Sequence, residues 1–80
     1  MIQSLNKGLQ VLGLLAERGT MSATDLAREL EVDKSTVSRI LTTLRGHDLV
    51  QIDQENKKYK LGYRILHWGE MLKNNYRLIS

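Results

Sequence analysis

The fold is decided by residues 33–46, which read DKSTVSRILTTLRG. At 100° per residue, the apolar side chains of this stretch fall within one arc of an α-helix: Val37, Ile40, Leu41 and Leu44. Asp33 is a favoured N-cap residue, so the helix is expected to run from about Lys34 to Gly46. One side of this helix therefore belongs to a core.

The opposite side of the same helix is short and polar. Ser35, Arg39 and Thr42 lie across from the apolar arc, and Ser38 and Thr43 lie at its sides. A solvated helix face more often carries Glu and Lys in i,i+4 pairs, and this face has none. Short hydroxyl side chains around one long cation permit close approach, so we expect this face to contact another molecule.

Upstream, the sequence predicts two more helices and a very short strand. Helical spacing of apolar residues predicts a first helix over residues 5–17, with Leu5, Leu9, Leu12, Leu15 and Ala16 in its stripe, widened by Val11 and Leu14. Residues 20–22 can form little more than a bridge-sized strand. Ser22 followed by Asp25 resembles a capping box and predicts a helix over residues 23–30. A three-residue turn, residues 31–33, joins it to the helix over residues 34–46.

Downstream, the pattern changes to a hairpin and a last helix. Strands are expected at residues 49–52 and 57–61, around turn formers at residues 53–56. Tyr59 is expected to pack under this hairpin. A final helix begins at Tyr63, with Ile65, Trp68, Leu72, Tyr76 and Ile79 about 3.5 residues apart. Because this helix is so apolar, we expect it to dock on a partner or to continue into further sequence.

Length and composition exclude several classes of protein. Eighty residues make one small domain, without cysteine and with only His47 and His67 as imidazole donors, both interpreted as structural. Disulfide scaffolds and zinc fingers are therefore excluded, and no cofactor or metal is expected. No aliphatic run approaches the length of a membrane span, and the N-terminus lacks signal-peptide features, so a cytoplasmic protein is expected. No catalytic constellation is present, so an enzyme is not expected.

Charge is distributed in blocks along the chain, which carries a net charge of +3. Residues 25–33 and 48–56 each carry −3, whereas residues 34–47 carry +3 and residues 57–64 carry +4. A fold could gather the two basic blocks on one face and attract an acidic partner. The alternative reading is a well-mixed solvated surface.

The order of elements is that of a winged helix-turn-helix. This predicts a mainly α fold with a small β-hairpin wing: a three-helix core, a two- to three-stranded sheet and a C-terminal linker helix. The second helix of a helix-turn-helix can enter the DNA major groove. The residues expected to contact DNA are Lys34, Ser35, Thr36, Ser38, Arg39, Thr42 and Thr43 on the helix over residues 34–46, Thr24 on the preceding helix, and Lys57 and Lys58 on the wing.

Four of these side chains have specific expected roles. Arg39 can reach a guanine edge with a bidentate contact, while Lys34 and the backbone N–H groups at the helix start favour a phosphate. Lys57 and Lys58 would lie near flanking phosphates, although a hairpin tip also commonly exposes lysines. The competing function is a winged helix that binds another protein through the same face. Such faces usually carry aromatic and aliphatic anchors, which this one lacks.

Four stretches in register resemble the N-terminal winged helix-turn-helix domain of IclR-type bacterial transcription regulators. They are residues 4–9 (SLNKGL), 25–27 (DLA), 34–44 (KSTVSRILTTL) and 59–62 (YKLG). The resemblance implies sequence-specific binding of double-stranded DNA at partly palindromic operators by a homodimer. It also implies a C-terminal effector domain, absent from this chain, that senses small metabolites. Residues 1–62 are then the DNA-binding domain and residues 63–80 the start of a linker and dimerisation helix.

The dimer contacts are expected on the first and last helices, at Leu5, Leu9, Leu66, Trp68, Leu72 and Tyr76, with a place in the core as the alternative for Trp68 and Tyr76. Three residues depart from the family pattern: Glu31 and Asp48 stand where glycine is frequent, and Ser38 where histidine is common. A left-handed non-glycine residue costs about 1–2 kcal/mol, so the turn at Glu31 is expected to take a different shape.

Overall fold

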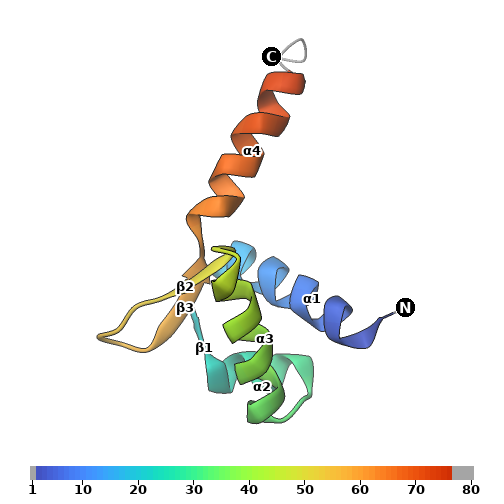
Figure 1. Cartoon of the computed structure of the whole chain (residues 1–80). Helices are drawn as coiled ribbons and strands as arrows, with labels where there is room; N and C mark the ends of the chain where they lie inside the picture. Colours follow the sequence, from blue (N-terminus) through green and yellow to red (C-terminus); the bar gives the residue numbers. More distant parts are fainter. Residues whose placement is uncertain (1, 77–80) are drawn as a thin grey trace.

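The computed structural model describes residues 2–76 and has the winged helix-turn-helix architecture that the sequence predicts (Figure 1). Its elements are α1 (Gln3–Arg18), β1 (Met21–Ser22), α2 (Ala23–Leu30), α3 (Lys34–Gly46), β2 (Val50–Ile52), β3 (Lys58–Leu61) and α4 (Tyr63–Asn75). Helices α1 to α3 form the body, the β2–β3 hairpin projects from one side as the wing, and α4 rises away from both. Ile79, predicted on the last helix, lies outside the described residues.

The core lies where the three helices of the body meet. Its fully buried side chains are Val11 and Leu15 of α1, Leu26 of α2, and Val37 and Leu41 of α3. The apolar stripe predicted for α1 is partly wrong, because Leu5, Leu9 and Ala16 are exposed. Helix α1 instead turns Gly8, Val11 and Leu15 inward, an i, i+3, i+7 series that leaves Leu5 and Leu9 on a neighbouring side.

The turn between α2 and α3 keeps a left-handed residue. Glu31 has φ 55° and ψ 45° and caps the C-terminus of α2, so the expectation of a differently shaped turn is wrong. The Val32 N–H donates to the Ala27 carbonyl at 3.1 Å, and Lys7 Nζ donates to the Leu30 carbonyl at 3.1 Å. These bonds satisfy carbonyls at the end of α2 and offset the cost of the left-handed residue.

The sheet is antiparallel, with strand order β1-β3-β2. Tyr59 of β3 pairs with Met21 on one side and Ile52 on the other. Its half-buried side chain packs against the core, as predicted. Ser22 caps α2 by accepting a hydrogen bond from the Asp25 N–H at 3.1 Å, so the N-terminal half of the predicted capping box is confirmed.

Helix α4 leaves the body at the end of β3 and buries none of its residues. Trp68 and Tyr76 are 51% and 56% exposed, so a core role for either side chain is wrong. Within residues 2–76, no helix is both long and apolar enough to cross a membrane.

Candidate nucleic-acid interface

The solvent side of α3 carries the polar residues that the sequence predicts there. Lys34, Ser35, Ser38, Arg39, Thr42 and Thr43 are exposed, and Thr36 is half-buried. Val37, Ile40 and Leu41 are buried on the other side of the helix. One face of α3 is therefore anchored in the core, and the opposite face is free to meet another surface. We call the exposed residues Lys34, Ser35, Ser38, Arg39, Thr42 and Thr43 the polar face.

The threonines of the polar face use their hydroxyl protons within the helix. Thr42 Oγ1 donates to the Ser38 carbonyl at 2.9 Å, and Thr43 Oγ1 donates to the Arg39 carbonyl at 3.1 Å. Each threonine keeps a methyl group and acceptor lone pairs for outside contacts. These two positions thus suit thymine methyl groups and amino donors of bases better than they suit phosphate oxygens.

The N-terminus of α3 carries both signs of charge, the Asp33 carboxylate and the Lys34 ammonium group. Asp33 occupies the N-cap position as predicted, but its carboxylate accepts the hydroxyls of Ser35 and Thr36 instead of a backbone N–H. These two hydroxyl donors hold the pKa of Asp33 below its ordinary value. A carboxylate at this point repels phosphate, whereas the exposed Lys34 beside it attracts phosphate, so the contact expected from the helix start and Lys34 stays a prediction.

Arg39 is exposed and forms no ion pair with any residue between 2 and 76. It borders a mostly apolar groove of about 420 Å³ between α1 and α3, whose walls include Leu5, Leu9 and Thr43. The guanidinium is therefore available to an outside acceptor. It is also the long cation nearest the middle of the polar face.

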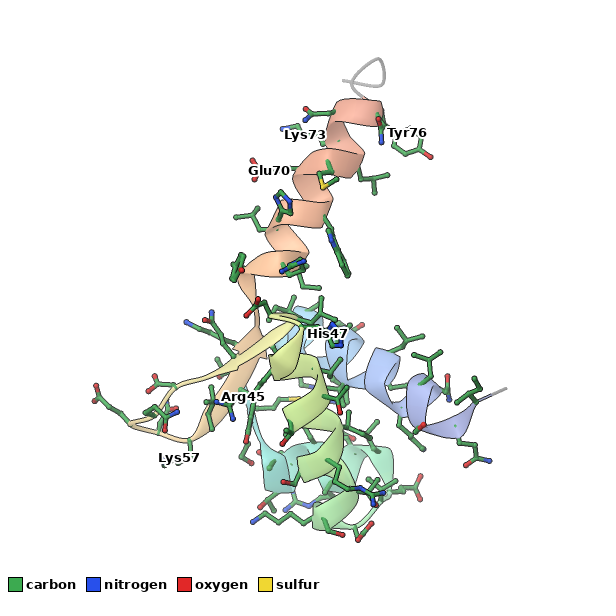
Figure 2. All side chains as sticks on the ribbon, in the orientation of Figure 1. Arg45, His47, Lys57, Glu70, Lys73 and Tyr76 are labelled. Carbon is green, nitrogen blue, oxygen red and sulfur yellow. The ribbon has the colours of Figure 1, made fainter. Side chains whose placement is uncertain are left out.

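Arg45 is a candidate contact that the site prediction missed. It is exposed and lines a hollow of about 400 Å³ between α3 and β2, together with Thr42, Gln51 and Gln54. Figure 2 shows Arg45 at the side of α3 that faces the wing. The signal was present in the basic block at residues 34–47, but Arg45 is not among the side chains that helical periodicity assigned to the outward face.

The wing tip carries both signs of charge. Lys57 and Lys58 are exposed at the tip, where Figure 2 labels Lys57, but Asp53 and Glu55 stand on the same turn. Lys57 Nζ donates to Gln54 Oε1 at 3.2 Å, and Asp53 Oδ1 accepts from the Glu55 N–H at 2.8 Å. These bonds order the tip, but two acids balance its two lysines, which limits its attraction for phosphate.

Thr24 is exposed in the first turn of α2. It follows Ser22, whose Cα pairs with that of Lys58 in the sheet. The start of α2 therefore follows a strand that pairs with the beginning of β3, on the outer side of the wing.

The residues predicted to form a dimer seam are all exposed, but they do not share one side. Leu5 and Leu9 of α1 are 58% and 59% exposed. On α4, Trp68, Leu72 and Tyr76 follow one another at i, i+4, i+8 and form a single stripe. Leu66 is six residues before Leu72, about 120° around the helix, so it lies off this stripe.

The two histidines lie on the surface of the molecule. Both His47 and His67 are exposed, and no group of three metal-ligating side chains occurs in the part of the chain that the structure describes. His47 is the C-cap residue of α3, and its N–H donates to the Leu44 carbonyl at 3.2 Å.

Comparison with known proteins identifies related domains. Residues 4–54 match the IclR helix-turn-helix domain. The chain is 35% identical over 72 residues to the HTH-type transcriptional regulator XynR of Escherichia coli (strain K12), covering 89% of this chain and 29% of XynR. The crystal structure of an IclR transcriptional regulator from Alicyclobacillus acidocaldarius superposes with a TM-score of 0.83 at 30% identity, covering 88% of this chain and 29% of that one. The chain thus spans less than a third of either relative.

A third similarity is to a domain seen with nucleic acid. The Zα domain of Carassius auratus PKZ, crystallised in complex with Z-DNA, superposes with a TM-score of 0.69 at 27% identity, over 74% of this chain and 97% of that domain. XynR and the Alicyclobacillus protein are described as transcriptional regulators rather than as enzymes.

Proposed function

The chain belongs to the IclR helix-turn-helix domain family, and from this premise we propose that it binds double-stranded DNA in a sequence-specific manner as the DNA-binding part of a transcription regulator. In this proposal α3 lies in the major groove and the wing lies over flanking phosphates. The observation that carries the proposal is the polar face of α3, short in its side chains and backed by buried Val37, Ile40 and Leu41. A major groove admits a helix only when the facing side chains allow close approach.

In this proposal, the base sequence of the DNA is recognised mainly by Arg39, Thr42 and Thr43. The exposed Arg39 has no ion pair with another described residue to give up and can make a bidentate contact with guanine O6 and N7. The two threonines offer methyl groups and acceptors to neighbouring bases. Ser35, Ser38 and Thr36 complete the predicted contact set at the start of α3, where the Asp33 carboxylate holds two of the three hydroxyls.

Phosphate contacts come from the flanks in this proposal. Arg45, Lys57 and Lys58 lie on the side of the wing, and Lys34 and Thr24 lie near the starts of α3 and α2. Such contacts fix the register on the duplex without reading its sequence. The Zα domain supports this use of the fold, since that domain was crystallised with Z-DNA.

We further propose that residues 1–62 form the DNA-binding domain and that residues 63–80 begin a linker helix for a homodimer. Support comes from the stripe Trp68, Leu72 and Tyr76, which is more than half exposed along a helix that buries nothing. Large exposed apolar side chains in a row mark an interaction surface. A two-fold dimer would read a partly palindromic operator, with half-sites about 34–36 Å apart or a multiple of this distance.

The remaining features of this proposal concern the whole regulator. The effector is a small molecule that binds a C-terminal domain outside this chain, and the regulator works in the bacterial cytoplasm without a cofactor of its own. The length of XynR, of which this chain spans 29%, leaves room for such a domain.

A second candidate function is protein recognition by the winged helix. The apolar groove between α1 and α3, with exposed Leu5 and Leu9 in its wall, favours it. The polar face argues against it, because hot spots at protein interfaces are rich in aromatic side chains and none stands on that face.

An amide-resolved NMR titration with a generic duplex at low salt separates the two candidates. Non-specific contacts use much the same surface as specific ones and weaken with salt. We expect shifts at residues 34–45 and 57–60 that fade as salt is added. A spectrum that does not respond to DNA would overturn the DNA-binding proposal and leave protein recognition.

A further inference from the structure

The direction of α4 relative to the body depends on very few contacts. Helix α4 buries none of its residues, and Figure 1 shows it projecting from the body at the end of β3. Within residues 2–76, the side-chain hydrogen bonds that join α4 to the body all go to one residue, Asp48. Asp48 lies just after α3, at the approach to β2.

The backbone of Asp48 forms one half of this junction. Asp48 has φ 60°, and its carbonyl accepts the Arg64 N–H at 3.1 Å. The next carbonyl, that of Leu49, accepts the Gly62 N–H at 2.8 Å. Gly62 permits this close approach, since a Cβ there would lie 2.2 Å from the Asp48 carbonyl oxygen.

The carboxylate of Asp48 forms the other half. Asp48 Oδ2 accepts the Tyr63 hydroxyl at 3.1 Å and lies 3.5 Å from Arg64 Nη2. The Arg64 guanidinium carbon lies 5.9 Å from the centre of the Tyr63 ring. Both partners are in the first turn of α4, so one carboxylate restrains the helix at its base. A partly exposed ion pair alone contributes little, and it is the convergence of three bonds on one residue that resists rotation.

Asp48 differs in this respect from the other left-handed residues. Glu31, Asp48 and Lys57 are the non-glycine residues with positive φ in the described chain. Glu31 accepts and donates no side-chain hydrogen bond there, and the Lys57 side chain bonds only within its own turn, to Gln54. Glycine at position 48 would adopt the same backbone without strain but would leave Tyr63 and Arg64 without their acceptor.

We propose that Asp48 is a positioning residue that holds α4 in one orientation relative to the DNA-reading body through Tyr63 and Arg64. The consequence for DNA rests on the proposed function. When two copies pair through α4, the direction of that helix sets the distance between the two α3 helices, and this distance must match the half-site spacing. With a loosened junction, the DNA-reading body of each copy can still bind a half-site, but the dimer no longer prefers one half-site spacing.

The test measures the orientation of α4 directly and does not involve DNA. The chain has no cysteine, so Gln10→Cys on α1 and Lys73→Cys on α4 provide two exposed spin-label sites. Labelled chain diluted with unlabelled chain gives the intramolecular distance distribution by pulsed electron paramagnetic resonance. We expect one narrow peak for the parent chain and a broad distribution for Asp48→Gly. Asp48→Gly keeps the fold, because glycine accepts the left-handed backbone.

Three further variants distinguish the carboxylate from the backbone. Tyr63→Phe removes one bond and is expected to broaden the peak less than Asp48→Gly does. Asp48→Asn retains an acceptor for the Tyr63 hydroxyl and is expected to restore most of the narrow peak. Glu31→Gly is the matched control, since it relieves the same backbone strain at a site without contact to α4, and its peak is expected to stay narrow. An Asp48→Gly distribution as narrow as that of the parent, or equal broadening in Glu31→Gly, would overturn the proposal.

A second measurement addresses the consequence for DNA. Duplexes with two half-sites at several spacings are compared with a duplex that carries one half-site. We expect Asp48→Gly to bind the single half-site as the parent does and to lose the preference among spacings. A parent chain that binds none of these duplexes would refute the proposed function, whereas the spin-label distances would still decide the role of Asp48.

Discussion

Replacing Arg39 with alanine tests the proposed reading face most directly. The Arg39 side chain is exposed and has no hydrogen bond or ion pair with another described residue. Its removal should therefore change the free energy of unfolding by no more than about 0.5 kcal/mol. The Thr43 hydroxyl bonds to the backbone carbonyl of residue 39, which the substitution leaves in place.

The expected loss in DNA binding follows from the contact that Arg39 can make. A bidentate contact with guanine discriminates by about 1–3 kcal/mol. At about 1.4 kcal/mol per tenfold change, this corresponds to a dissociation constant roughly 5- to 150-fold higher for the preferred duplex. The loss should fall on one base pair, and duplexes that already carry another base there should bind the variant and the parent about equally.

The assay uses duplexes selected from a randomised pool by the parent chain. Fluorescence anisotropy then gives dissociation constants for the selected duplex and for its single-base variants at fixed salt. Lys73→Ala removes the same charge at the far end of α4, where Figure 2 shows Lys73, and controls for net charge. Arg39→Lys keeps the charge but cannot form the planar fork.

Two results would refute this reasoning. Equal weakening of all duplexes by Arg39→Ala, with recovery in Arg39→Lys, would make Arg39 a phosphate contact. An unchanged affinity for the selected duplex would remove Arg39 from the interface altogether.

Three other predictions address the wing, the junction and the start of α3. Lys58→Ala should reduce the slope of log affinity against log salt by about one unit while sparing sequence preference, and an unchanged slope in a salt titration would remove the wing from the footprint. Gly62→Ala should destabilise the fold by about 1–3 kcal/mol in urea unfolding, since its Cβ would lie 2.2 Å from the Asp48 carbonyl oxygen; a stability equal to the parent would contradict that close approach. Because the folded-state pKa of Asp33 is lowered, its carboxylate stabilises the fold above the unfolded pKa of about 3.9, and this contribution is lost as pH falls through the lower folded value. Asp33→Asn should therefore lose less stability than the parent between pH 6 and pH 3 in urea unfolding, and equal losses would refute the role of the two hydroxyl bonds.

Local rules explain which elements were predicted well. The bounds expected for α2 and α3 agree with the structure because Ser22, Asp33 and the apolar spacing act within one or two helical turns. The hairpin strands begin one residue later than expected, at Val50 and Lys58. Strand ends depend on pairing with a distant segment, so they are less well determined by the neighbouring residues.

Periodicity predicted that α1 is a helix but not which of its apolar side chains are buried. Seven apolar residues cover a wide arc of this helix, and several rotations would bury a comparable set. Packing against α3 decides between them: the Gly8 side of α1 faces Ile40, whose Cγ2 would lie 3.8 Å from a Cβ at position 8, an ordinary contact distance. Val11 and Leu15 are then buried, and Leu5 and Leu9 remain exposed.

By itself the sequence determined the order of elements, the polar face of α3 and the family, because these depend on residue types at short separations. Only the tertiary structure decided which side chains from distant parts of the chain lie next to each element. It placed Arg45 beside the wing, and it joined Asp48 to the first turn of α4, a contact across 15 or 16 residues. Such contacts depend on how a chain closes on itself, which no local pattern encodes. The surfaces proposed for DNA and for a second copy were therefore visible in the sequence, but their relative orientation was not.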